Sequence, residues 1–282
     1  MNRMKKLYAK YLPKIIGNYF NTLALISPRK AAMAAVKVFS TPRKGRVQEA
    51  QADYLEKAKY QVFETQGHQL QAYEWQGKGP KVLLLHGWES NSFRWRNLIA
   101  ELQQKNYHIL AIDAPAHGHS SGATLNVPLY AACAHDIIDQ EKPDFVIGHS
   151  MGGMSTLYYQ YKYQNQGLKK IVSLGSPSEL KEIMAHYQGM LGFNQRVLRA
   201  QDDYFLERFG FRINDFSTTE FSKDITLPCL LVHDEDDQIA PFHSAERMMA
   251  NLPNGQLIRT KGLGHSLHQK EVNQQIVAYL NS

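Results

Sequence analysis

The sequence has 282 residues, of which 43% are hydrophobic, and its formal net charge is +6. This length suits one large α/β domain or two small domains, and the composition excludes a disordered or low-complexity chain. The two cysteines, Cys133 and Cys229, are far apart in apolar segments, which predicts buried free thiols in a reducing compartment and hence a cytoplasmic protein. The twelve histidines show no spacing typical of a zinc site, so no metal is expected.

Basic residues are concentrated at the N-terminus. Residues 1–46 contain eleven Lys and Arg and no acidic residue, so the rest of the chain has 21 basic and 26 acidic residues. Two amphipathic helices are predicted here, at about 5–25 and 28–39. Ser27-Pro28 marks the start of the second, since serine is a good N-cap and proline suits the first helical position. We therefore expect a basic helical N-terminal arm over residues 1–58.

The arm combines an interrupted apolar run with a strong basic surplus. A secretory signal peptide is disfavoured because Pro13, Lys14 and Gly17 interrupt the apolar run, and no stretch approaches the roughly 20 apolar residues of a spanning helix. The arm is expected to pack on the catalytic body, or to contact an anionic membrane surface through residues 1–46, and the two are compatible. No nucleic acid partner is expected, since no binding motif accompanies the charge. The residues expected to face lipid are Tyr8, Tyr11, Ile15, Ile16, Tyr19 and Phe20.

Strand and helix patterns alternate over most of residues 59–282. A first pair of strands, joined at 66–68, reads as a hairpin, and the later apolar runs read as buried parallel strands. Such a series predicts a doubly wound, mostly parallel sheet with helices on both faces, and a site at the C-terminal ends of the strands. The predicted strands are 60–64, 69–75, 81–85, 107–112, 144–148, 171–174, 227–233 and 256–259. The predicted helices between them are 93–105, 128–140, one from about 151, 241–251 and 271–280.

The alternation pauses at about 178–225. This stretch predicts helices at about 178–191, 193–209 and 217–222, rich in Met, Tyr, Phe and Leu. A helical insertion between two sheet strands is typical of a cap, and we expect a cap domain here.

Gly148-His149-Ser150-Met151-Gly152 follows an apolar strand and precedes a helical segment. This pentapeptide fits G-x-S-x-G, in which a strained strand-to-helix turn exposes the serine hydroxyl. Small residues are required on both sides, because side chains there would collide with neighbouring backbone. Ser150 is therefore the candidate nucleophile.

A serine hydroxyl is a weak nucleophile near neutral pH and needs a base and an acid that orients the base. His265 follows the last predicted strand, so it is the candidate base. The acid lies among Asp234, Glu235, Asp236 and Asp237, which follow the preceding strand. Both segments are at strand C-termini, where parallel sheets place ligands.

These motifs resemble the α/β-hydrolase superfamily, of the lipase, esterase and serine aminopeptidase type with a helical cap, over residues 60–282. His86-Gly87-Trp88 resembles its H-G-x oxyanion turn, and residues 113–120 resemble its D-x-P-G-H-G-x-S loop, with Ala116 in place of glycine. Asp237, four residues before Pro241, matches the acid of its G-x-x-D-x-x-x-P loop, although Asp234 replaces the usual glycine.

The resemblance implies a Ser150–Asp237–His265 catalytic triad. It also implies an oxyanion hole formed by the backbone N–H groups of Trp88 and Met151. The expected function is a serine hydrolase that cleaves an ester-type acyl bond of a small-molecule substrate through an acyl-enzyme, without a cofactor. Thioesterase, amidase or peptidase, and carbon–carbon hydrolase activities remain alternatives with the same triad, and a noncatalytic membrane-associated binding protein is a further one.

Overall fold

The computed structural model describes the backbone of residues 3–282 and the side chains of residues 11–282. The chain forms two compact units. The first, the helical unit, contains the residues up to 41 together with 179–217. The second, the catalytic unit, contains residues 42–178 and 218–282.

The catalytic unit is built on one eight-stranded sheet with the strand order β1-β2-β4-β3-β5-β6-β7-β8. Strand β2 pairs antiparallel with both β1 and β4, and all the other pairs are parallel. The doubly wound, mostly parallel sheet is thus confirmed. Its strands are β1 (Lys59–Thr65), β2 (His68–Trp75), β3 (Lys81–Leu85), β4 (His108–Ile112), β5 (Phe145–His149), β6 (Lys170–Leu174), β7 (Cys229–Asp234) and β8 (Gly255–Thr260).

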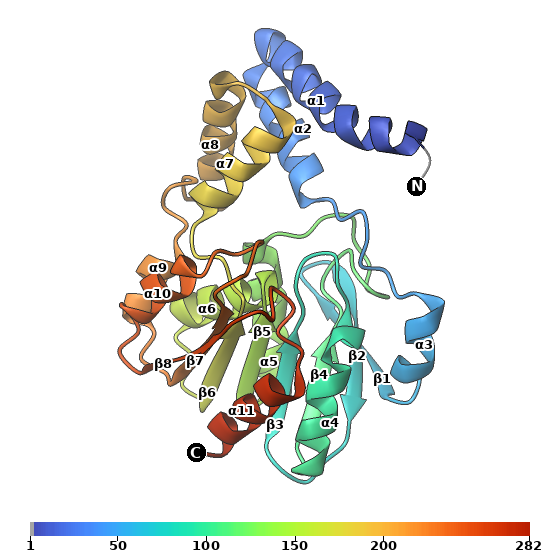
Figure 1. The fold of residues 1–282 in the computed structure, drawn as a ribbon, viewed down its shortest axis with the longest axis vertical. Helices are drawn as coiled ribbons and strands as arrows, with labels where there is room; N and C mark the ends of the chain where they lie inside the picture. Colours follow the sequence, from blue (N-terminus) through green and yellow to red (C-terminus); the bar gives the residue numbers. More distant parts are fainter. Residues whose placement is uncertain (1–2) are drawn as a thin grey trace. The chain divides into compact units, whose positions relative to one another are not determined.

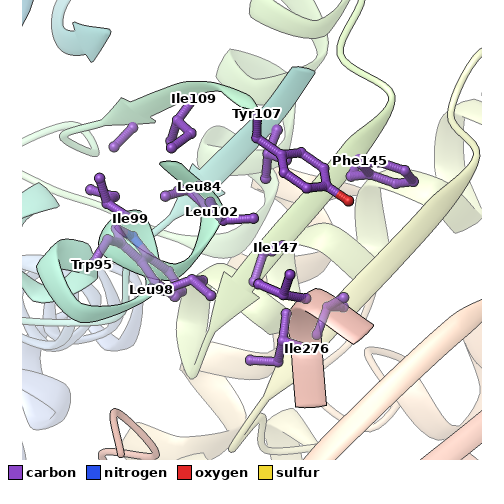
Figure 2. Packing of buried hydrophobic residues seen from close by; sticks show 14 of the residues in the cluster. Leu84, Trp95, Leu98, Ile99, Leu102, Tyr107, Ile109, Phe145, Ile147 and Ile276 are labelled. Atoms are coloured by element: carbon purple, nitrogen blue, oxygen red, sulfur yellow. The ribbon is translucent and has the colours of Figure 1, made fainter. Parts of the chain in front are cut away.

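Both faces of the sheet are covered by helices (Figure 1). Neighbouring residues of a strand point to opposite faces. Leu84 therefore packs in one core cluster with α4 (Arg96–Gln104) and α11 (Lys270–Asn281), and Leu83 packs in the other with α5 (Val127–Glu141) and α6 (Met151–Tyr163). Figure 2 shows the first cluster, in which Leu98 and Ile99 of α4 and Ile276 of α11 meet side chains of the central strands. This two-sided burial explains why the strands are continuous apolar runs.

The helices of the catalytic unit begin and end within a few residues of the predicted positions, with one addition. Helix α3 was not predicted, because its seven residues carry no strong periodic pattern. The N-caps follow local chemistry, as at α5, where the side chain of Asn126 accepts a hydrogen bond from the backbone N–H of Leu129. The helices are α3 (Glu49–Leu55), η1 (Ser92–Trp95), α4 (Arg96–Gln104), α5 (Val127–Glu141), α6 (Met151–Tyr163), α9 (Thr218–Phe221), η2 (Ser222–Asp224), α10 (His243–Met249) and α11 (Lys270–Asn281).

The helical unit contains α1 (Arg3–Ile26), α2 (Pro28–Ser40), α7 (Leu180–Leu191) and α8 (Gln195–Phe209). The N-terminal helices therefore pack on the two long helices of the insertion. Phe20 meets Phe193 edge to face at 6.4 Å, and the Tyr187 hydroxyl donates to the Ala35 carbonyl at 2.9 Å. A Cβ at Gly17 would lie 2.1 Å from the Leu191 carbonyl oxygen, so α1 can approach α7 this closely only with glycine there.

The predicted arm helices are confirmed, but not every side chain faces as expected. Phe20, expected to face lipid, is buried against the insertion, so that part of the prediction is wrong. Ile16 is half-buried, and Tyr11, Ile15 and Tyr19 are exposed. Tyr8 lies outside the described side chains. Over the part of the chain that the structure describes, no helix is both long enough and apolar enough to cross a membrane.

Candidate active site

Ser150 lies at the sharp turn between β5 and α6. Its backbone has φ +53° and ψ −118°. Residues other than glycine rarely adopt this conformation, which costs about 1–3 kcal/mol. Two hydrogen bonds hold the turn: the Ser150 N–H donates to the Leu174 carbonyl at 2.7 Å, and the Ser176 hydroxyl donates to the Ser150 carbonyl at 3.1 Å. The neighbouring strand β6 thus stabilises the strained turn.

The glycines beside Ser150 are required by close backbone approaches. A Cβ at Gly152 would lie 2.1 Å from the Leu85 carbonyl oxygen, and one at Gly148 would lie 2.3 Å from the Gly152 carbonyl oxygen. On the other side of the turn, a Cβ at Gly87 would lie 2.9 Å from the Cβ of Ser150. The end of β3, the start of α6 and the segment after β3 therefore converge on Ser150.

The acid and base candidates are in direct contact. Nδ1 of His265 is 2.8 Å from Oδ2 of Asp237, and the Asp237 carboxylate is fully buried while the imidazole is 21% exposed. Oδ1 of Asp237 accepts the N–H groups of Ile239 and Ala240 at 2.8 and 2.9 Å. Although burial raises the pKa of Asp237, the hydrogen bonds from His265 and these N–H groups hold it below its ordinary value. The carboxylate is thus ionised and oriented toward the imidazole.

The other acidic residues of this loop have different contacts. Asp234 is buried and accepts hydrogen bonds from the Asp236 N–H, the Thr260 hydroxyl and the Leu263 N–H at 2.8–3.0 Å. Glu235 forms an ion pair with Arg259 at 3.2 Å. Asp237 is the acid of this loop whose carboxylate reaches His265.

Three side chains from other elements hold the loop that carries His265. Nε2 of His149, the residue before Ser150, donates to the His265 carbonyl at 2.8 Å, and their ring centroids are 4.8 Å apart. Arg94 of η1 donates to the Ser266 carbonyl at 2.7 Å, and Asn97 of α4 donates to the His268 carbonyl at 3.0 Å. Burial and the charge of Arg94 lower the pKa of His149 well below its usual value. Its ring is therefore neutral and carries its proton on Nε2, since a carbonyl can only accept.

Hydrogen bonds with two histidine side chains hold the segment after β3 on both sides of Trp88. His86 donates from Nδ1 to the Gly87 carbonyl at 2.7 Å and accepts the Ala114 N–H at Nε2 at 2.9 Å. Beyond Trp88, Nε2 of His117 accepts the Glu89 N–H at 3.0 Å. Burial lowers the pKa of His86 to about 3, so the ring stays neutral. These contacts fix the backbone around Trp88.

The loop from 113 to 120 supports this segment through a buried carboxylate. Asp113 accepts hydrogen bonds from the N–H and hydroxyl of Ser92, both at 2.8 Å, and from the His119 N–H at 2.9 Å. A Cβ at Gly118 would lie 1.8 Å from this carboxylate. Ala116 has φ +67°, a left-handed conformation that glycine adopts more readily, at the position where the sequence departs from the family motif.

The polar groups around Ser150 include a backbone donor at the start of α6. Met151 is the first residue of α6, so its backbone N–H has no partner within the helix and points from a helix N-terminus, which favours negative charge. Within the described residues, the Ser150 hydroxyl makes no hydrogen bond with His265, and no group of three His, Cys, Asp or Glu side chains is placed to hold a metal ion. Asp237 and His265 are thus paired, and this pair lies near the turn that carries Ser150.

A mostly parallel sheet with a serine elbow after β5 and an acid–histidine pair after β7 and β8 defines an α/β hydrolase. The family model for the alpha/beta hydrolase fold matches residues 80–213, and a model for TAP-like proteins matches residues 214–282. The chain belongs to the α/β-hydrolase fold family.

Relatives with curated names are distant but cover most of the fold. The chain is 25% identical to a non-heme haloperoxidase of Rhodococcus erythropolis, over 78% of this chain and 99% of the relative. It is also 25% identical to the bifunctional esterase/perhydrolase DCH of Acinetobacter calcoaceticus, over 72% and 92% of the two chains. Among solved structures, the esterase EaEST from Exiguobacterium antarcticum has the same fold, with a TM-score of 0.64 at 19% identity over 78% of this chain and 99% of that one. These similarities support a hydrolase of the ester type.

Sequence reasoning missed the residues that hold the base. Arg94 and Asn97 carry no motif, and they are 172 and 171 residues away along the chain from the carbonyls that they contact. His149 stands inside the recognised pentapeptide, but the sequence assigned it no role. His86, the first residue of the predicted H-G-x turn, holds the backbone before Trp88 through two hydrogen bonds.

Proposed function

We propose that this chain is a serine hydrolase that cleaves an ester-type acyl bond through an acyl-enzyme intermediate. The observation that carries the proposal is the 2.8 Å contact between Asp237 and His265, beside a serine held in a strained elbow. The ester-hydrolysing relatives support the same reaction class.

In this mechanism, His265 accepts the proton of the Ser150 hydroxyl at its Nε2 as the hydroxyl oxygen attacks the acyl carbonyl. Asp237 keeps the imidazole in the required tautomer and stabilises the imidazolium that forms. The imidazolium then protonates the leaving group, and the same histidine activates the water that releases the acid. Deacylation returns the serine hydroxyl and the neutral imidazole.

Negative charge on the substrate oxygen develops as the serine attacks. We propose that the backbone N–H groups of Met151 and Trp88 stabilise it, the first aided by the dipole of α6. The buried neutral rings of His86 and His117 fix the backbone on either side of Trp88. Because both donors are backbone groups, the side chains at 88 and 151 can vary without removing them.

The test combines turnover with labelling of the nucleophile. Purified protein is assayed against p-nitrophenyl esters from acetate to palmitate and labelled with a fluorophosphonate probe. Ser150→Ala should abolish both signals while circular dichroism and the melting temperature remain close to wild type. The matched control, Ser266→Ala, changes an exposed serine next to His265 and should keep both signals.

The outcomes separate the alternatives. Labelling at Ser150 without ester turnover would favour a thioester, amide or carbon–carbon substrate, and wild-type protein that is neither labelled nor active would support a noncatalytic binding protein. Two relatives are named haloperoxidase and perhydrolase, so hydrogen peroxide should also be offered as a competing acyl acceptor. Faster acyl transfer to peroxide than to water would change the assigned acceptor and leave the nucleophile in place.

We further propose a small-molecule acyl substrate and a reducing, cytoplasmic location. Cys133 and Cys229 are free and buried, and burial raises the pKa of each thiol to about 12. Such thiols are unreactive and need no oxidising compartment. Fractionation of cells that express the full chain would test the location.

A further inference from the structure

Over residues 11–26, whose side chains the structure describes, helix α1 is apolar on two opposite faces, and one of these faces is buried. The inner face contains Gly17, Phe20 and Ala24, all buried within the helical unit. The outer face is expected to be polar for a helix at the surface of a soluble protein. An exposed apolar face of this kind marks an interaction site.

The outer face presents a row of exposed apolar side chains. Tyr11, Ile15, Tyr19 and Ile26 follow one another at helical spacings of four, four and seven residues, and Leu25 adjoins Ile26. Their exposed fractions are 53, 63, 57, 83 and 68%, respectively. We call these five residues the α1 stripe. Tyrosine is enriched at the boundary between water and acyl chains, because its ring is apolar and its hydroxyl is polar, and isoleucine supplies further apolar surface.

The helical unit that carries the stripe also carries the charge of the protein. Its residues, up to 41 and 179–217, contain thirteen Lys and Arg and six Asp and Glu, a formal charge of +7. The catalytic unit contains 19 basic and 20 acidic residues, a formal charge of −1. An apolar stripe on a strongly basic unit is complementary to a surface that is both apolar and negatively charged.

A shallow hollow lies beside the end of the stripe. Its volume is about 400 Å³, and it is lined by Pro28, Arg196, Arg199, Ala200 and Asp203. Pro28 follows Ile26 by two residues, and the two arginines are three residues apart on α8, so their side chains project from the same side of the helix. Guanidinium groups in this position suit the phosphate of a lipid headgroup.

We propose that the helical unit docks on an anionic lipid bilayer through the α1 stripe, with Arg196 and Arg199 contacting headgroup phosphates. The stripe enters the boundary between headgroups and acyl chains, in the manner of an amphipathic helix that lies in the membrane plane. The basic surplus of the unit supplies the attraction to the anionic leaflet. The proposal is independent of the reaction at Ser150.

The test uses full-length protein sedimented with vesicles of phosphatidylcholine alone or mixed with phosphatidylglycerol. Binding to anionic vesicles should be at least about tenfold stronger than to neutral ones. It should weaken at about 1 M salt, where the screening length falls to about 3 Å. Equal binding to both vesicles, or no binding to either, would overturn the proposal.

Variants that place a negative charge in the stripe distinguish docking through α1 from nonspecific adsorption. Ile15→Glu combined with Ile26→Glu should reduce binding at least about tenfold. Val62→Glu is the matched control, because Val62 is a 56% exposed apolar residue on β1 of the catalytic unit, and it should bind as wild type. Melting temperatures close to wild type establish that both variants fold. Wild-type binding by the stripe variant, or an equal loss of binding in the control, would overturn the assignment to α1.

Two further measurements test the headgroup contact and the competing occupant. Arg196→Gln combined with Arg199→Gln should lower binding to anionic vesicles and leave binding to neutral vesicles unchanged, and unchanged anionic binding would remove the hollow from the docking surface. Analytical ultracentrifugation without lipid should show no self-association that depends on Ile15 and Ile26. A dimer abolished by the stripe variant would assign the stripe to a second copy of the chain and overturn the proposal.

Discussion

Lowering the pH from about 8 to about 5 should destabilise the catalytic unit through its buried neutral histidines. His86 is fully buried and His149 is 6% exposed, and each makes a hydrogen bond that requires no charge on the ring. Burial lowers the pKa of His86 to about 3 and that of His149 well below its usual value. In the unfolded chain both rings titrate at about 6.5.

The sign and size of the effect follow from these values. Below about pH 6.5 the unfolded chain binds a proton at His86 that the folded protein does not, so the free energy of unfolding falls as the pH falls. A pH of about 5 lies about 1.5 units below the pKa of His86 in the unfolded chain, so His86 lowers the free energy of unfolding by about 2 kcal/mol at that pH. His149 lowers it further in the same direction. The free energy of unfolding of a typical domain is about 5–15 kcal/mol in total, so this loss is a substantial part of it. Asp237 affects the free energy of unfolding at lower pH. Because its pKa is depressed in the folded protein, the stabilisation that its carboxylate provides is lost only as the pH falls below about 4.

Urea unfolding at about pH 8, 6.5 and 5 would measure this loss. We expect the midpoint to fall at a constant m-value, with a steeper decline below about pH 6.5 than above it. His149→Phe should make the decline between pH 6.5 and 5 shallower than in wild type, because one titrating ring is removed. Stability that is unchanged or higher at pH 5 would refute the burial of neutral rings from which the magnitude was derived.

The remaining predictions concern the site itself. Asp237→Asn should lower kcat by about 10⁴-fold, because the imidazole loses its orienting carboxylate, whereas Asp236→Asn should change it less than about threefold; the reverse ranking in steady-state kinetics would move the acid. His149→Phe keeps a ring but loses the hydrogen bond to the His265 carbonyl. The value of kcat/KM should therefore fall about tenfold, which corresponds to a loss of about 1.4 kcal/mol. An unchanged kcat/KM would show that this hydrogen bond does not position the base. Gly152→Ala should cost about 3 kcal/mol or more in urea unfolding, because its Cβ would lie 2.1 Å from the Leu85 carbonyl oxygen. Gly189→Ala in α7, with nothing within 4 Å of its new Cβ, should instead stabilise by about 0.5–1 kcal/mol, and a similar loss in both variants would contradict the steric argument.

The sheet could be predicted because its signal is local. A strand buried on both faces, such as β3, must be a continuous apolar run, and a connection between parallel strands must contain a helix. Helix α3 was missed because seven residues give too little periodicity to separate a helix from a loop. The partner of the arm could not be predicted, because amphipathic faces specify burial without saying what covers them. In the structure, α1 and α2 are covered by the insertion helices α7 and α8.

The candidate site was predictable only where its chemistry is tied to a motif. Ser150, Asp237 and His265 each follow a strand at the same edge of a parallel sheet, so topology alone brings their segments together. The residues that fix the base obey no such rule. Arg94 reaches the loop of His265 from another element, and no spacing along the chain distinguishes it from any other surface arginine.

Asp234, one of the two departures from the family motif, shows how the site is held. The family has glycine there, but in this chain the buried carboxylate of Asp234 joins the loop after β7 to the loop after β8, through the Thr260 hydroxyl and the Leu263 N–H. Although burial raises the pKa of Asp234, these donors hold it below its ordinary value, so the carboxylate accepts both bonds as an anion. The two loops that it joins carry the acid and the base. The contacts of Asp234 therefore help to hold Asp237 and His265 within hydrogen-bond distance. Asp234 departs from the family motif, yet it supports the acid–histidine geometry for which the motif is known.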